Sequence, residues 1–192
     1  MVKPRSLHIL ILTGLLVALV ILFILGISPE RIARPAGTPD TPADAVALDA
    51  ETKSVTLFFL REEDGMFVPE TRTIAASGTI AQEAEAVLNE LIKGSANGLA
   101  SALPPEAKVG QVFVTKDGTA YADFSKDLID AHPSGSEAEQ ATVFAIVNTL
   151  ARNFKSVKKV FILVDGEERE TLDGHITLNR AFLPDYSLVA KD

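Results

Sequence analysis

The feature that most constrains this chain is an uncharged apolar run from Ile9 to Ile27, interrupted only by Thr13, Gly14 and Gly26. A helix of this length spans roughly 28 Å, which matches the hydrocarbon core of a bilayer. The run has no polar face, so it does not fit a helix packed on the surface of a globular core. We therefore predict a transmembrane helix over residues 9–27.

The charges that flank this run indicate its orientation. Lys3 and Arg5 precede it, which favours a cytoplasmic N-terminus over residues 1–8. Two arginines shortly after the run weaken this orientation. A cleaved signal peptide is the alternative, but its apolar region usually has about 7–15 residues and ends at a small-x-small site. Leu25–Ser28 is a poor site of that kind. We expect an uncleaved signal anchor that crosses the cytoplasmic membrane once and places the C-terminal domain outside.

The next part of the chain, residues 28–54, contains four prolines and many alanines, and we predict that it is a semi-stiff linker. Residues 55–192 are expected to form one folded domain. This domain holds 13 basic and 21 acidic residues, and therefore carries the whole net charge of −8. Such a charge argues against nucleic acid as a partner and predicts repulsion from anionic lipid.

Hydrophobic periodicity predicts the elements of the folded part. Thr79–Gln82 and Ser136–Glu139 read as capping boxes that begin helices, and Asp117-Gly118 reads as a hairpin turn. The expected order is strands 55–60 and 67–75, helix 79–94, strands 109–115 and 119–124, helix 136–153, and strands 160–164 and 169–172. We therefore predict an α+β fold, a two-layer sandwich with two helices packed on one face of a mixed sheet.

Residues that could support catalysis or metal binding are sparse. The chain has no cysteine, which excludes disulfides and thiolate chemistry. Ser125, Asp123 and His175 are the right types for a hydrolase triad, but no Gly-x-Ser-x-Gly elbow accompanies them. His132 and His175 alone are a weak indication of a metal site. The acidic residues of the stretch 165–173 do not have the spacing of a calcium-binding loop. We predict no catalytic residue, no cofactor and no metal. The sequence does not exclude a pair of carboxylates that hydrolyses glycosidic bonds, because the distance between the two groups depends on the fold.

One basic cluster stands out in the acidic domain. Lys155, Lys158 and Lys159 follow the second predicted helix. A solvated turn explains them without any function. The alternative is a docking patch for an acidic surface, including that of a second copy of the chain, because opposite charges on one module favour head-to-tail contact.

Five segments, taken in their order and spacing, resemble the GerMN domain of sporulation and spore-germination proteins. They are Val55–Leu60, Leu88–Gly94, Gly98–Pro104, Asp117–Ser125 and Val164-Asp165-Gly166. The resemblance implies a bacterial, extracytoplasmic, membrane-tethered module whose fold is similar to the ring-building motifs of envelope assemblies. It supplies no catalytic residue. This chain has one copy of the domain where some members have two, and it lacks a lipobox cysteine, so its anchor would be the N-terminal helix.

These observations lead to one preferred function and two alternatives. We expect a non-catalytic module, linked to sporulation or germination, that binds envelope proteins or a second copy of itself. The alternatives are a tethered cell-wall hydrolase and a domain that binds a small ligand. Convergent carboxylates in a pocket would favour the hydrolase, and an enclosed apolar cavity would favour the ligand-binding domain.

Overall fold

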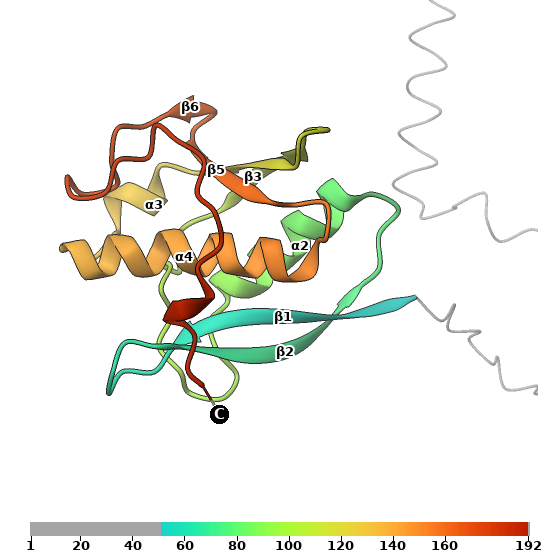
Figure 1. The fold of residues 1–192 in the computed structure, drawn as a ribbon, viewed down its shortest axis with the longest axis horizontal. Coiled ribbons are helices and arrows are strands. Elements are labelled where there is room, and N and C mark those ends of the chain that lie inside the picture. The colour runs from blue at the N-terminus through green and yellow to red at the C-terminus, as the bar shows by residue number, and fades with distance from the viewer. Residues whose placement is uncertain (1–50, 192) are drawn as a thin grey trace, which may run out of the picture. The chain divides into compact units, whose positions relative to one another are not determined.

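The computed structural model describes residues 51–191 (Figure 1). The predicted anchor over residues 9–27 and nearly all of the predicted linker lie outside these residues. Among the described helices, none is both long and apolar enough to cross a membrane. The elements are β1 (Thr52–Leu60), β2 (Phe67–Ala75), α2 (Ile80–Ile92), β3 (Val109–Val114), β4 (Thr119–Phe124), α3 (Asp127–Asp130), α4 (Ser136–Asn153), β5 (Lys159–Val164), β6 (Glu167–Glu168) and the 3₁₀ helix η2 (Tyr186–Leu188).

The strands form two sheets, so the prediction of a two-layer sandwich with a single mixed sheet was wrong. β1 and β2 make an antiparallel hairpin, and the second sheet has the order β3-β4-β5-β6, with β4 and β5 parallel. Helices α2 and α4 lie between the hairpin and the four-stranded sheet and contact both (Figure 1). The predicted α+β class is confirmed, and both helices do pack on one face of the larger sheet.

The hairpin stays separate because the outer edge of β1 is already hydrogen-bonded. The Thr56 amide donates to Asn153 Oδ1 at 2.8 Å, and the Phe58 amide donates to Thr149 Oγ1 at 3.3 Å. The Leu60 amide donates to the carbonyl of Ala100 at 2.9 Å. Because the amides along this edge already donate to a helix and a loop, the edge does not pair with a further strand.

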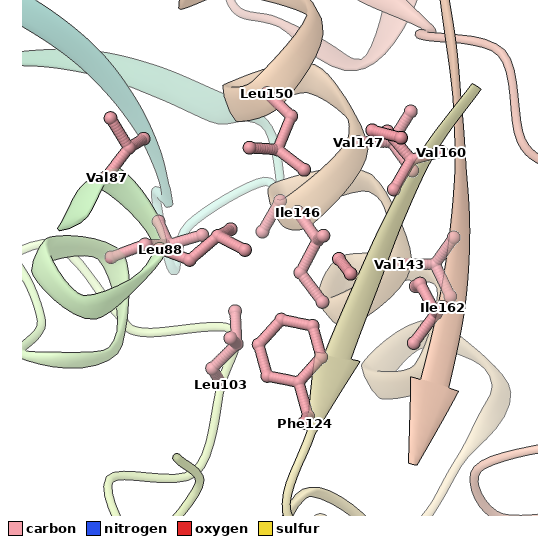
Figure 2. Packing of buried hydrophobic residues seen from close by; sticks show 14 of the residues in the cluster. Val87, Leu88, Leu103, Phe124, Val143, Ile146, Val147, Leu150, Val160 and Ile162 are labelled. Atoms are coloured by element: carbon pink, nitrogen blue, oxygen red, sulfur yellow. The ribbon is translucent and has the colours of Figure 1, made fainter. Parts of the chain in front are cut away.

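The core extends from the hairpin to the larger sheet, and its central part lies between the two helices and the inner face of the larger sheet. Figure 2 shows Leu88 of α2 and Ile146 and Leu150 of α4 gathered around the same interior as Phe124 of β4. All four side chains are fully buried, and burial of each stabilises the fold by about 1.5–3 kcal/mol. The remaining labelled core residues are Val87, Leu103, Val143, Val147, Val160 and Ile162.

The predicted start of the first helix is confirmed. The hydroxyl of Thr79 accepts a hydrogen bond from the amide of Gln82, which is the N-cap half of a capping box, and it donates to Gln82 Oε1 at 3.0 Å. Gly94 follows the helix with φ of +84°, the left-handed conformation in which glycine terminates helices.

The second predicted capping box was wrong. The N-cap of α4 is Gly135, which offers no side chain, and Ser136 is already helical. Glu139 turns inward instead. Its fully buried carboxylate accepts hydrogen bonds from the amides of Asp173, His175 and Ile176, and so fixes the loop after β6.

Two strand boundaries also differ from the predictions. β1 begins at Thr52, three residues before the predicted start of the folded part. The last strand pairs at Glu167–Glu168 rather than at 169–172. Asp165 and Gly166 both have positive φ, 53° and 73°. Two consecutive left-handed residues make the tightest hairpin turn, so the chain returns to β5 at once.

Candidate docking surface

The surface of greatest interest begins at the turn between β3 and β4. Gly118 has φ of +88°, and its carbonyl accepts a hydrogen bond from the amide of Lys158 at 2.8 Å. A Cβ at this position would lie 3.0 Å from the carbonyl oxygen of Ser156. The absence of a side chain at Gly118 therefore lets the β3–β4 turn and the turn before β5 lie directly against each other.

Asp117 completes this turn by holding neighbouring groups. Its carboxylate accepts hydrogen bonds from the hydroxyls of Thr115 and Thr119 and pairs with Lys159 at 3.2 Å. These three interactions hold the pKa of Asp117 well below its usual range. The carboxylate is therefore charged at neutral pH and neutralises Lys159.

The structure thus separates the three predicted docking lysines. Lys159 is half-buried and paired with Asp117. Lys155 is exposed on the turn after α4 and does not line the hollow described next. Lys158 is exposed and does line it. The sequence indicated a basic region, but only the fold shows which lysine faces a surface feature.

An open hollow of about 600 Å³ lies beside Lys158. Ile80 and Phe113 border it and are 46% and 49% exposed, although both are large apolar side chains. Lys116 and Lys158 border it as well, and neither forms an ion pair within residues 51–191. We call Ile80, Phe113, Lys116 and Lys158 the β3 patch.

A row of stacked rings supports Phe113. Its ring lies 4.7 Å from that of Tyr121 at an interplanar angle of 7°, and Tyr121 lies 5.5 Å from Phe161. These residues are direct neighbours across β3, β4 and β5. Their alternating neighbours Val112, Ala120, Val160 and Ile162 are buried toward the helices, so the row lies on the outer face of the sheet. Phe113 is therefore held in place although it is half exposed.

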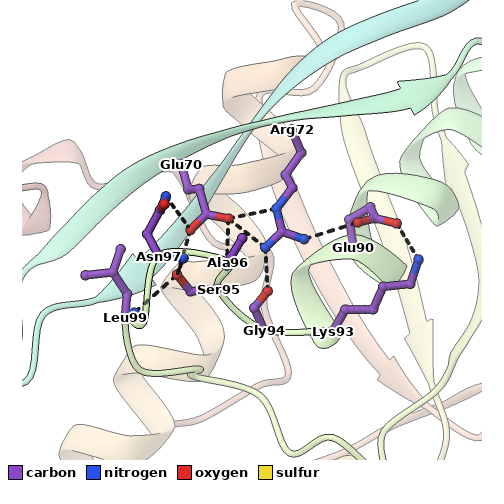
Figure 3. Close-up of polar contacts among 9 residues, drawn as sticks. All are labelled: Glu70, Arg72, Glu90, Lys93, Gly94, Ser95, Ala96, Asn97 and Leu99. Carbon is purple, nitrogen blue, oxygen red and sulfur yellow. Dashed lines mark hydrogen bonds and ion pairs between the residues drawn. The ribbon is translucent and has the colours of Figure 1, made fainter.

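The most extensive polar network lies elsewhere, between β2 and the end of α2 (Figure 3). Glu70 is only 3% exposed and accepts hydrogen bonds from Ser95, from the amide of Ala96 and from Asn97. Arg72 pairs with Glu70 at 2.6 Å and donates to the carbonyl of Gly94 at 2.7 Å. Burial alone would raise the pKa of Glu70, but these hydrogen bonds and Arg72 lower it to about 2. Each group is satisfied internally, so the network serves to fix the loop after α2.

Comparison with known families decides the identity of the domain. The family model described as "Germane: Sporulation and spore germination" matches residues 56–170. The chain belongs to the Germane family. This match begins within β1, runs through β6 and includes both long helices, and it confirms the resemblance to the GerMN domain.

Relatives of known name agree with the family. This Germane chain is 30% identical over 138 residues to the spore germination protein GerM of Bacillus subtilis (strain 168), an alignment that covers 68% of the chain and 36% of GerM. It therefore spans about a third of the length of that relative. The solved tandem GerMN domains of the sporulation protein GerM from B. subtilis align with a TM-score of 0.57 and 28% identity over 70% of this chain and 46% of theirs. The first GerMN domain alone aligns with a TM-score of 0.56 and 28% identity over 69% and 97%.

The three residues considered for a hydrolase triad each interact with a different partner in the Germane domain. Ser125 donates to Asp127, Asp123 accepts from the amide of Gly166, and His175 lies beside Glu139. No hydrogen bond in the described part of the chain joins the three. No group of three metal-ligating side chains was found in residues 51–191.

Three members of the β3 patch are not among the residues that the sequence predicted as functional. Ile80, the first residue of α2, belongs by its spacing to the apolar stripe of that helix, yet it is 46% exposed. Phe113 follows the strand alternation that places Val112 inside, so its exposure could have been read from the pattern. Lys116 lies in the predicted hairpin turn, and nothing local relates it to Lys158.

Proposed function

We propose that the chain is a non-catalytic docking module of the bacterial cell envelope in a sporulation or germination context. In this proposal residues 9–27 anchor it in the cytoplasmic membrane, and the Germane domain acts outside the cytoplasm. The β3 patch binds a protein partner whose surface is apolar at its centre and acidic at its rim. The observation that carries the proposal is the exposure of Ile80 and Phe113 beside Lys116 and Lys158.

The physical argument rests on what the patch can gain from contact. About half of each large apolar side chain is exposed, and aromatic anchors often dominate the energy of protein interfaces. The stack on Tyr121 already orders Phe113, so binding costs little side-chain entropy. Lys116 and Lys158 at the rim favour an acidic partner and speed its encounter. Anionic lipid fits less well, because the folded part carries a net charge of −8.

A tethered cell-wall hydrolase is the alternative function, because three glutamates lie close together at one surface. Glu62, Glu63 and Glu137 line an open groove beside the β1–β2 turn. All three are exposed, whereas the general acid of a glycosidase usually acquires its raised pKa by burial. Their position favours ion pairing with a basic surface over acid catalysis.

A photo-crosslinking experiment tests the docking role. Phe113 is replaced by benzoylphenylalanine in the full chain, expressed in its native host and irradiated in intact membranes. A matched chain carries the same probe at Thr73, which is exposed on β2. We expect a defined protein adduct from position 113 that is lost when Lys158→Glu is added. Equal adducts at both positions, or none at position 113, would overturn the proposal.

A further inference from the structure

A second hollow has the properties that the β3 patch requires of a partner. It is a groove of about 620 Å³ between the β1–β2 turn and the start of α4. Its apolar lining comes from Leu60, Met66, Phe67, Ala138, Ala141 and Leu188. Its rim holds Glu62, Glu63 and Glu137, which are exposed and make no ion pair in the described part of the chain. We call this the acidic groove.

The neighbouring charges do not cancel this acidity. Asp64 also lines the groove, but it is bound by Arg61 through two hydrogen bonds, of 3.1 and 2.7 Å. That pair is neutral as a unit and orders the β1–β2 turn. Three glutamates are left to attract cations at the rim. The β3 patch offers two lysines, and Lys155 lies on the same turn as Lys158.

The two surfaces lie at opposite ends of one helix. Glu137, Ala138 and Ala141 belong to the first turns of α4, whereas Lys158 follows its last residue, Asn153, by five positions. An 18-residue helix is about 27 Å long. Figure 1 shows the start of α4 near the β1–β2 turn and its end near the start of α2. The patch cannot reach the groove of its own domain.

We infer that the β3 patch of one copy docks into the acidic groove of a second copy. This inference rests on the proposed function and names its partner. Ile80 and Phe113 supply the apolar projection, the groove supplies an apolar floor, and lysines of one copy meet glutamates of the other. The chain itself thus carries both halves of the complementary pair, in charge and in apolar character.

The symmetry of the contact decides how far association continues. A two-fold dimer satisfies the inference only if both contacts form at once, with the patch of each copy in the groove of the other. A single patch-to-groove contact is head-to-tail, and it leaves one free patch and one free groove on every pair. Association through single contacts therefore continues beyond a dimer, whereas the reciprocal contact stops at one.

A charge-swap experiment tests the inference on the full chain in an uncharged detergent. One variant reverses the patch with Lys116→Glu and Lys158→Glu, and another reverses the groove with Glu63→Lys and Glu137→Lys. Each alone places like charges at the contact, and we expect self-association to weaken roughly tenfold or more in sedimentation velocity. A control with Lys108→Glu and Lys126→Glu makes the same charge change as the patch variant, outside both surfaces, and should associate like the native chain.

Mixing the two reversed variants gives the decisive result. The negative patch of one then faces the positive groove of the other, so association should return in the mixture. A mixture that stays monomeric, or single variants that associate like the native chain, would overturn the inference. If the mixture fails while benzoylphenylalanine at position 113 still captures a different protein, the docking role stands and the second copy is not its partner.

Engineered cysteines give an independent readout, because the chain has none of its own. The double variant Lys116→Cys with Glu63→Cys should form disulfide-linked species under mild oxidation, a ladder if the contacts are single and head-to-tail or a dimer alone if they are reciprocal. Neither single variant should form a dimer alone, whereas a mixture of the two should. A dimer formed by one single variant would show that identical positions meet, and it would contradict docking of the patch in the groove.

Discussion

At the scale of single residues, Glu70 shows how the fold uses a buried charge. Its pKa falls from an ordinary value of 4.5 to about 2 because Ser95, Ala96 and Arg72 stabilise the charged form against the cost of burial. A lowered folded-state pKa stabilises the fold above the unfolded pKa and loses this contribution as the pH falls through the folded value. At neutral pH the contribution is about 3 kcal/mol, since one pKa unit corresponds to about 1.4 kcal/mol.

We therefore predict that Glu70→Gln lowers the free energy of unfolding by about 3 kcal/mol at pH 7. The difference from the native chain should shrink between about pH 4.5 and pH 2, as the native carboxylate is protonated. Urea unfolding at several pH values measures both effects. Glu63→Gln, at an exposed position that forms no ion pair within residues 51–191, should change stability by less than about 0.5 kcal/mol. A pH-independent effect of Glu70→Gln would show that its charge is not the cause.

At the scale of elements, the β3–β4 turn is held against its neighbour by the small size of Gly118. Gly118→Ala adds a Cβ 3.0 Å from the Ser156 carbonyl in addition to strain at φ of +88°. Gly94→Ala introduces similar strain at +84° but meets no atom within 4 Å. We predict a loss of about 1 kcal/mol for Gly94→Ala and about 1–3 kcal/mol more for Gly118→Ala. Equal losses in thermal unfolding would exclude a role for the contact with Ser156.

A second prediction concerns the edge of β1. Asn153 on α4 accepts from the Thr56 amide at 2.8 Å and donates to the Thr56 carbonyl at 2.7 Å. Asn153→Ala removes both partners, so we expect about 1–3 kcal/mol of destabilisation and faster hydrogen exchange at the Thr56 amide. Asn89→Ala is the matched control, because the side-chain amide of exposed Asn89 donates to the carbonyl of Glu85 in its own helix. Unchanged exchange at Thr56 would mean that another group protects the edge.

The same edge explains how much of the fold could be predicted. Local signals such as Thr79 with Gln82, and Asp117-Gly118, located helices and turns correctly. The division into two sheets could not be read from them, because alternation shows which face of a strand is buried but not which strand pairs with it. Asn153 of α4 and Glu85 of α2 accept hydrogen bonds from backbone amides at strand edges, yet in the sequence they look like ordinary polar positions.

At the scale of the whole molecule, the candidate surfaces depend on contacts between distant segments. Of the predicted lysine cluster, only Lys158 belongs to the β3 patch. The fold brings Ile80, Phe113 and Lys116 beside this lysine from other parts of the chain. The acidic groove likewise combines the β1–β2 turn with α4. Net charge, by contrast, was evident from the sequence, and it sets the long-range force between copies.

That force leads to a prediction for head-to-tail association. Two domains of this size have centres about 37 Å apart on contact. Charges of −8 on each then repel by about 2 kcal/mol in 0.01 M salt but by less than about 0.1 kcal/mol in 0.15 M salt. A lysine–glutamate pair at about 4 Å contributes about 0.9, 0.6 and 0.3 kcal/mol in 0.01, 0.15 and 1 M salt. Between 0.01 and 0.15 M salt, the loss of repulsion between the two net charges therefore outweighs the weakening of two lysine–glutamate pairs.

We therefore predict that association of the full chain passes through a maximum near physiological salt. The dissociation constant should fall roughly tenfold between 0.01 and 0.15 M salt and rise about threefold by 1 M. Sedimentation velocity in an uncharged detergent at the three concentrations measures this. Because the patch-reversed variant places like charges at the contact, its residual association should only rise with salt. A monotonic decrease for the native chain would show that local ion pairs dominate over net charge, and a monotonic increase would show that Lys116 and Lys158 take no part in the contact.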